Sequence, residues 1–135
     1  MNTTNSSITN KANVYKTQQI MTASPQELTL MLYNGAIRFV TESIQAIERK
    51  DIPKAHETNI KAQNIVREFM NTLDMQYEVS EGLDKLYDYI EYRLIQANIK
   101  KDISQLEEAK GMLTELRDTW YQVMKLARGQ QAVGK

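Results

Sequence analysis

The chain contains no cysteine and only one histidine among its 135 residues. Without cysteine it can form no disulfide bond, no thiolate zinc site and no cysteine nucleophile. His56 has no second histidine with which to build the paired Glu-x-x-His ligands of a di-metal helical bundle, and we interpret it as an exposed structural residue. No glycine-rich phosphate loop, G-x-S-x-G or H-E-x-x-H motif occurs. The sequence therefore predicts a protein that is not an enzyme and that holds no cofactor and no metal.

An excess of charge of one sign and a long apolar run are also missing. Lys and Arg together number 17, as do Asp and Glu, so the formal net charge is zero. A nucleic-acid-binding protein usually carries a basic excess. No apolar run approaches the ~18 residues of a membrane span, and the polar N-terminus lacks the apolar core of a signal peptide. We expect a cytoplasmic protein that binds no nucleic acid and does not insert into membranes.

The two ends of the chain are polar. Residues 1–19 are rich in Asn, Thr, Ser and Lys, and their few apolar side chains cannot offset the entropy that is lost on ordering. We expect this segment to be flexible, either disordered or folded back as a lid. Residues 129–135 are predicted to form a disordered tail. Residues 20–128 are long enough for one domain with a single core.

The middle of the chain predicts four helices and no strand. The predicted ranges are 25–49, 52–73, 81–100 and 103–128. The first helix begins with a capping box, Ser24 to Glu27, and has Pro25 at its first position. Asp51 and Asp102 are placed to cap the second and fourth helices. Because short connections make neighbouring helices antiparallel, we predict an all-α fold, an antiparallel up-and-down four-helix bundle with a flexible N-terminal segment.

The two short connections resemble each other. Residues 49–52 read Arg-Lys-Asp-Ile, and residues 100–103, at a spacing of 51, read Lys-Lys-Asp-Ile. Both place basic side chains at the end of one helix and an Asp at the start of the next, which complements both helix dipoles. The likeness has two interpretations, an internal repeat or the shared chemistry of tight helix–helix turns.

Two predicted helices carry more apolar surface than a bundle core requires. The first is apolar over about 200° of its circumference, whereas a surface helix needs ~100°. The third has a core stripe that includes Leu86, while Val123 belongs to the predicted core stripe of the fourth. The third also carries a second apolar row. The residues that we predict to contact a partner are Leu30, Tyr33 and Ile37 on the first helix and Tyr89, Tyr92, Ile95 and Ile99 on the third.

Three interpretations of this extra apolar surface remain open, since monomers rarely expose large apolar patches. The bundle can pack irregularly, with the first helix touched on several sides. The surface can be a groove that receives amphipathic helices of another chain. The N-terminal segment can cover it as a lid, in competition with a partner.

The chain resembles the flagellar secretion chaperone FliS family over about residues 15–128. The residues that carry the resemblance are Tyr15, Thr22-Ala23-Ser24-Pro25, Leu28, Met31-Leu32-Tyr33, Gly35-Ala36, Phe39, Leu83, Leu86-Tyr87, Tyr89, Arg93-Leu94, Ala97-Asn98, Asp102 and Trp120. The family commonly has a glycine-rich turn before the third helix, whereas this chain has Tyr-Glu-Val-Ser-Glu-Gly at residues 77–82. This departure concerns the geometry of that loop.

The resemblance implies a cytosolic chaperone that binds the disordered C-terminal segment of flagellin in hydrophobic grooves. Such a chaperone prevents premature polymerisation and helps to deliver flagellin to the cytoplasmic domain of the type III export gate. The family's N-terminal tyrosine region, here Tyr15, is associated with the lid and with docking at the gate. The alternatives from the residues alone are a self-associating bundle, a homodimer when free of client, and a regulatory adaptor for another helical protein.

Overall fold

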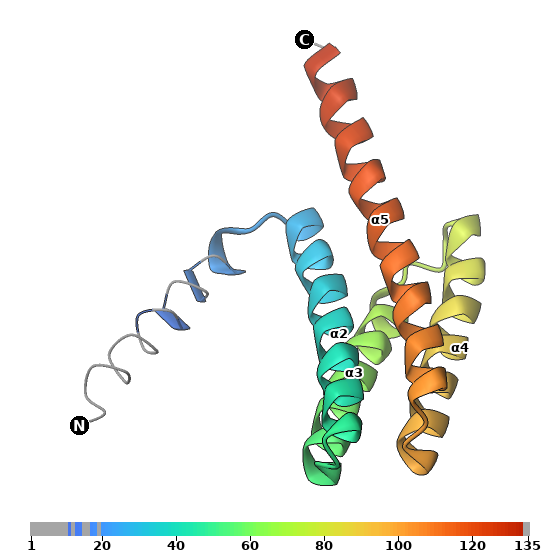
Figure 1. Cartoon of the computed structure of the whole chain (residues 1–135). Helices are drawn as coiled ribbons and strands as arrows, with labels where there is room; N and C mark the ends of the chain where they lie inside the picture. Colours follow the sequence, from blue (N-terminus) through green and yellow to red (C-terminus); the bar gives the residue numbers. More distant parts are fainter. Residues whose placement is uncertain (1–10, 12, 15–16, 19, 134–135) are drawn as a thin grey trace.

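The structure is a four-helix bundle. It is a computed structural model that describes residues 11, 13, 14, 17, 18 and 20–133. The helices are α2 (Pro25–Glu48), α3 (Ile52–Thr72), α4 (Glu78–Lys100) and α5 (Ile103–Val133), and no described residue lies in a strand. Successive helices run in opposite directions (Figure 1). Both α2 and α4 pack against α3 and α5, so the helices close into a ring. The predicted all-α antiparallel bundle is confirmed.

Three helices begin where their capping residues predict. The Ser24 hydroxyl accepts the backbone N–H of Glu27 at 3.2 Å, and Pro25 follows at the first helical position. Asp51 caps α3 in the same way, through the N–H of Lys54. At the start of α5, hydrogen bonds from Ser104 hold the pKa of the Asp102 carboxyl below its ordinary value. These bonds satisfy N–H groups that the first turn of a helix leaves unpaired.

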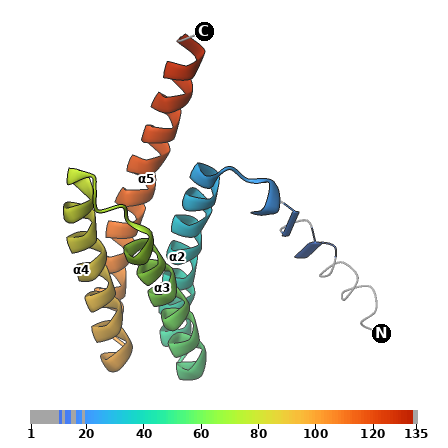
Figure 2. The same cartoon turned by 180° about the vertical axis from the view of Figure 1, so that it is seen from behind.

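Two boundaries differ from the prediction by three residues or more. Helix α4 begins at Glu78, three residues early, because its N-cap Tyr77 makes no side-chain capping bond that a sequence could reveal. Helix α5 continues to Val133, past the predicted end at residue 128, since residues 129–133 contain no proline to break it. Residues 134–135 and most of 1–19 lie outside the described residues. The described part of the N-terminal segment stands away from the bundle (Figures 1 and 2).

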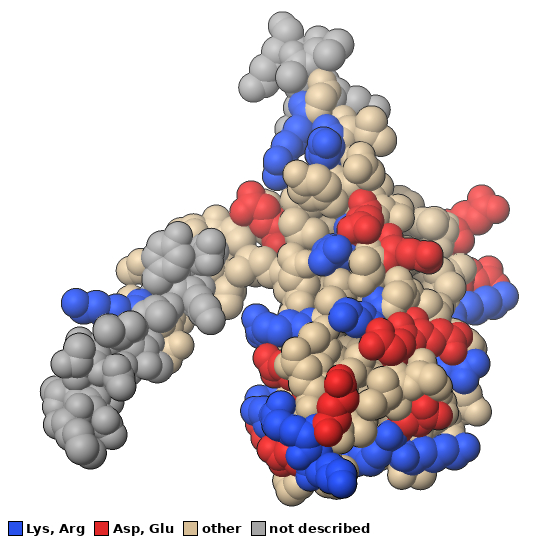
Figure 3. All heavy atoms as spheres, in the orientation of Figure 1, with Lys and Arg blue, Asp and Glu red and all other residues tan. Residues whose placement is uncertain are grey.

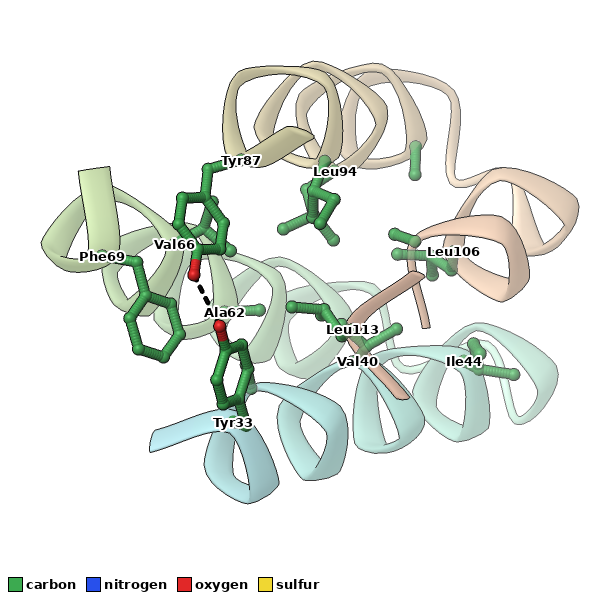
Figure 4. Close-up of a cluster of buried hydrophobic side chains, with 14 residues drawn as sticks. Tyr33, Val40, Ile44, Ala62, Val66, Phe69, Tyr87, Leu94, Leu106 and Leu113 are labelled. Atoms are coloured by element: carbon green, nitrogen blue, oxygen red, sulfur yellow. Dashed lines mark hydrogen bonds between the residues drawn. The ribbon is translucent and has the colours of Figure 1, made fainter. Parts of the chain in front are cut away.

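All four helices contribute to one core. Figure 4 shows aliphatic side chains in its middle and an aromatic group at one end. The Phe69 ring stacks on those of Tyr33 and Tyr87, with centroid distances of 4.5 and 5.3 Å. The two tyrosine hydroxyls lie 2.5 Å apart and form a hydrogen bond between α2 and α4. Because both side chains are buried, the pKa of each hydroxyl is raised above its ordinary value.

Buried amides connect α3 to α4, a feature that the sequence analysis did not find. The Asn59 side chain donates to the backbone carbonyl of Leu94 at 3.1 Å, and Gln63 donates to the Asn59 amide oxygen at 2.7 Å. Asn59 and Gln63 lie one turn apart on the face of α3 that also carries the buried Ala55 and Ala62. Their hydrogen bonds satisfy polar groups that would otherwise destabilise the core.

Two residues that were predicted to be in the core are exposed. Leu86 on α4 is 42% exposed, and Val123 on α5 is 46% exposed. Both helices start from their connection side by side and then diverge (Figures 1 and 2). The prediction was wrong for these two residues because periodicity gives the face of a helix but not the distance to its neighbour.

Candidate functional site: a groove along α2 and α3

A hollow of about 600 Å³ lies along the seam between α2 and α3. Its wall is mainly apolar, and it includes Ile20, the residue that directly follows the N-terminal segment. From α2 and α3 it is lined by Leu28, Met31, Leu32, Asn34, Gly35, Arg38, Phe39 and Ile65. We call this hollow the α2/α3 groove.

The local sequence explains the shape of the groove. Leu28, Leu32, Gly35 and Phe39 follow one another at intervals of four, three and four residues, which places them on one face of α2. Gly35 adds no side chain to this face. A Cβ atom there would lie 3.5 Å from the Cδ1 atom of Ile65, so the glycine leaves that aliphatic side chain open as the floor.

Charges of both signs border the groove at Phe39. The Arg38 guanidinium and the Lys61 ammonium lie 5.0 and 5.5 Å from the centre of the Phe39 ring, within cation–π range. Each also pairs with a carboxylate one turn away, Arg38 with Glu42 at 3.8 Å and Lys61 with Glu57 at 3.1 Å. The hydrogen bond from Lys61 holds the pKa of Glu57 below its ordinary value. The groove therefore has an apolar floor and a polar, mixed-charge border.

The three predicted contacts on α2 lie outside this groove. Tyr33 is only 4% exposed and belongs to the core, which corrects its prediction as a partner contact. Leu30 and Ile37 are half-buried. One turn before Leu30, the Gln26 carbonyl accepts the Trp120 indole N–H of α5 at 3.0 Å. The part of the apolar arc on α2 that lines the groove carries Leu28, Leu32 and Phe39, of which Leu32 is exposed and the other two are half-buried.

The predicted row on α4 is mostly exposed. Tyr92 and Ile99 are 55% and 71% exposed, while Ile95 is half-buried. Tyr89 instead joins α4 to α5. Its hydroxyl donates to Glu108 at 2.7 Å and accepts from the Arg93 Nε at 2.8 Å, and Arg93 lies 3.3 Å from the same carboxylate. We call Tyr89, Arg93 and Glu108 the α4/α5 clasp. Tyr15 lies outside the described residues.

The described residues offer no other chemistry at the groove. Among them, no three His, Asp or Glu side chains are placed to hold a metal ion. On the face that Figure 3 shows, acidic and basic side chains are intermingled. None of the helices in the described part of the chain is both long enough and apolar enough to cross a bilayer.

Known proteins identify the family. The model of the family described as "Flagellar protein FliS" matches residues 8–127. This chain belongs to the FliS family. The Flagellar secretion chaperone FliS of Bacillus subtilis is 44% identical to it over 121 residues, which cover 90% of this chain and 91% of that relative. The FliS of Salmonella typhimurium is 33% identical, with coverages of 84% and 86%.

A solved structure supports the fold. A crystal structure of a flagellar chaperone from bacteria superimposes with a TM-score of 0.70 at 18% identity, and the match covers 87% of this chain and 97% of that one. FliS proteins are chaperones, a class of non-enzymes, and membership of this family supports a chaperone role in flagellar export for this chain.

Proposed function

We propose that this FliS protein binds the disordered C-terminal segment of flagellin, with one amphipathic helix of that segment in the α2/α3 groove. Binding in the cytoplasm prevents premature polymerisation and presents the subunit to the cytoplasmic domain of the export gate. The observation that carries the proposal is the apolar groove, together with the naming of several relatives as flagellar secretion chaperones.

The groove has the chemistry of helix-in-groove recognition. An amphipathic helix presents apolar side chains at intervals of three and four residues, the same intervals that Leu28, Leu32, Gly35 and Phe39 follow on α2. The open space at Gly35 and Ile65 can receive a large apolar side chain. The mixed charges beside Phe39 then face the polar side of the client helix. A segment that folds on binding spends ~2–5 kcal/mol or more on ordering, so a large apolar contact is required.

Two further surfaces belong to the proposal. The exposed row of Tyr92, Ile95 and Ile99 provides a second client contact on α4. Residues 1–19 act as a lid, and the position of Ile20 in the groove wall supports this role. In the lid model Tyr15 leaves the bundle when the client binds and becomes available to the gate. Free protein can also form a homodimer through these apolar surfaces.

Leu32→Glu tests the groove directly. Leu32 is 37% exposed, so the substitution should change the melting temperature little, while a carboxylate in an apolar contact costs several kcal/mol when it is desolvated. We expect at least a ~100-fold weaker Kd for a peptide of the flagellin C-terminal region, measured by calorimetry. The matched control is Ile52→Glu, another exposed aliphatic residue, located in the first turn of α3 and outside the groove.

The same titration separates the parts of the proposal. Unchanged peptide affinity in Leu32→Glu would refute the groove as the client site, and an equal loss in Ile52→Glu would show a general effect of charge.

The other surfaces of the proposal are tested separately. Ile99→Asp should weaken binding of the flagellin peptide without lowering the melting temperature. Deletion of residues 2–20 should leave unfolding cooperative and the affinity equal or higher. Light scattering with and without the peptide distinguishes a chaperone, which converts to a 1:1 complex, from a peptide-insensitive self-associating bundle.

A further inference from the structure

A second apolar surface lies on the opposite side of the bundle, between α4 and α5. A hollow of about 160 Å³ is lined there by Leu86, Met112, Glu115, Leu116 and Thr119. The two seams are opposite because α2 and α4 each pack against both α3 and α5 in the closed ring. The α4/α5 hollow and the exposed residues along its two helices form what we call the α4/α5 furrow.

Helix α5 lines the furrow with a coiled-coil pattern. Met112, Leu116, Thr119, Val123 and Leu126 follow one another at intervals of four, three, four and three residues, the spacing of a and d positions in a heptad repeat. The first three line the hollow, and Val123 and Leu126 continue the row as exposed side chains. At a rise of 1.5 Å per residue the row is about 20 Å long, which matches four turns of a partner helix.

Helix α4 leaves room for such a partner. Val79 and Gly82 share the face of Leu86, seven and four residues away. Val79 and Leu86 are exposed, and a Cβ atom at Gly82 would meet nothing within 4 Å. Here α4 presents two apolar side chains and a stretch of open backbone, which allows a second helix to approach closely.

The α4/α5 clasp closes one end of the furrow. The clasp of Tyr89, Arg93 and Glu108 joins α4 to α5, and from the connection at residues 101–102 the two helices diverge toward the other end of the bundle (Figures 1 and 2). Leu86 and Val123 lie on the open side of the clasp. Periodicity assigned both residues to the core, but both are exposed in the structure. The core pattern is thus incomplete at the place where one more helix would complete it.

The charges beside the furrow indicate what kind of helix fits. Glu78 on α4 and Glu115 on α5 are exposed, and in the described part of the chain neither forms a salt bridge. The basic residue on the same side of α4, Lys85, lies 3.9 Å from the Glu81 carboxylate. A partner helix with Lys or Arg beside its apolar stripe would compensate the free carboxylates, whereas an acidic helix would be repelled.

We propose that the α4/α5 furrow docks one helix of another protein, about 14 residues long, apolar at heptad spacing and flanked by Lys or Arg. The site goes beyond the flagellin-binding function proposed above. Since it lies across the bundle from the α2/α3 groove, client and second partner can be bound at the same time.

The test uses the full-length chain and two synthetic 15-residue helical peptides. Both carry Leu at a and d positions, one with Lys and the other with Glu at the flanking positions. We expect the Lys peptide to bind at least ~10-fold more tightly at low ionic strength, measured by fluorescence anisotropy. Glu115→Lys should reduce that preference several-fold, because it removes one of the two free carboxylates beside the furrow.

Variants locate the binding site. The double substitution Leu86→Lys with Val123→Lys should abolish binding of the Lys peptide, because it places like charge in the furrow, and should leave the melting temperature near that of the wild type, since both side chains are exposed. Gly82→Leu provides a second variant, which fills open space instead of adding charge. Leu32→Lys in the α2/α3 groove is the matched control and should leave Lys-peptide binding unchanged. The flagellin peptide should bind the double variant as it binds the wild type.

Five outcomes would overturn the proposal. Equal binding of the Lys and Glu peptides removes the charge argument, and binding that survives both furrow variants places the peptide elsewhere. A wild-type dimer that the double variant converts to a monomer makes a second copy the occupant. A tenfold gain in Lys-peptide affinity on deletion of residues 2–20 makes the N-terminal segment the occupant. Loss of flagellin-peptide binding in the double variant makes the furrow a client site. Failure of the proposed function is a different result, unchanged flagellin-peptide affinity in Leu32→Glu.

Discussion

The α2–α3 and α4–α5 hairpins begin with the same turn and then pack differently. In each, a lysine adopts the left-handed conformation, Lys50 with a φ of 64° and Lys101 with a φ of 52°. In each, the next residue donates its backbone N–H to a carbonyl five residues earlier. These bonds run from Asp51 to Ala46 (2.8 Å) and from Asp102 to Ala97 (3.0 Å). They are the six-to-one bonds of a Schellman motif, so turn chemistry accounts for the likeness between the two connections.

Side-chain size separates the two hairpins beyond the turn. The α2–α3 pair includes fully buried Ala46, Ala55 and Ala62, and the Ser43 hydroxyl donates to the Ala55 carbonyl at 2.9 Å across the seam. Small residues let two helices stay in close contact. The α4–α5 pair has its two fully buried alanines, Ala97 and Ala109, close to its turn and the clasp, and it opens past the clasp. A turn therefore fixes the direction of a hairpin, and the side chains between the helices fix how far they remain in contact.

The largest difference is expected between two leucines of α4 on either side of the clasp. Leu94 is fully buried, whereas Leu86 lies in the open furrow. Leu94→Ala should reduce the free energy of unfolding by about 2–5 kcal/mol, because it removes buried methyl groups and leaves a cavity. Leu86→Ala should cost less than about 1 kcal/mol, as at most exposed sites. Urea denaturation measures both, and equal losses would mean that the furrow is closed in solution.

A smaller effect is expected at the tyrosine pair, which connects the two hairpins through α2 and α4. Tyr33→Phe and Tyr87→Phe should each cost about 1–2 kcal/mol, because each leaves one buried hydroxyl without its partner. The double variant should cost less than the sum of the two, and additive losses would show that the hydroxyls do not interact.

The same pair predicts a pH dependence. Since burial raises the pKa of both hydroxyls, the folded state holds their protons more tightly than the unfolded chain does. The resulting stability is fully present below the unfolded pKa of about 10 and is lost as the pH rises through the folded values. In thermal melts between pH 9 and 11, the wild type should therefore lose more stability than the double variant.

Helix starts were predictable where the cap is a side chain. Three helix starts were predicted from the capping residues Ser24, Asp51 and Asp102. In each case a side-chain oxygen accepts a first-turn backbone N–H that has no carbonyl partner within the helix. The start of α4 was not predictable in this way, since Tyr77 caps it without a side-chain bond. Family membership was likewise accessible from motifs, because those motifs span most of the chain.

The site was only partly predictable. A helical projection shows that α2 has a wide apolar arc but not which edge of it faces a neighbour, so Tyr33 was predicted as a partner contact and Leu32 was not. Gly35 was the available signal, since it is the position on this face of α2 that carries no side chain. On α3, the spacing of Asn59 and Gln63 within the alanine face could have indicated a buried amide pair.

The smallest effect concerns the two turns and has the opposite sign, a gain in stability. A non-glycine residue in the left-handed conformation costs about 1–2 kcal/mol, so Lys50→Gly should stabilise the fold by about 0.5–1 kcal/mol. Lys101→Gly should gain less, because it also removes two bonds of 2.6 Å from the Lys101 ammonium to the carbonyl and side chain of Asn98. Urea denaturation compares the two. Equal gains would show that the two Lys101 hydrogen bonds contribute nothing to stability. The two turns would then have the same energy as well as the same backbone conformation. The difference between the hairpins would then come from the side chains beyond the turns.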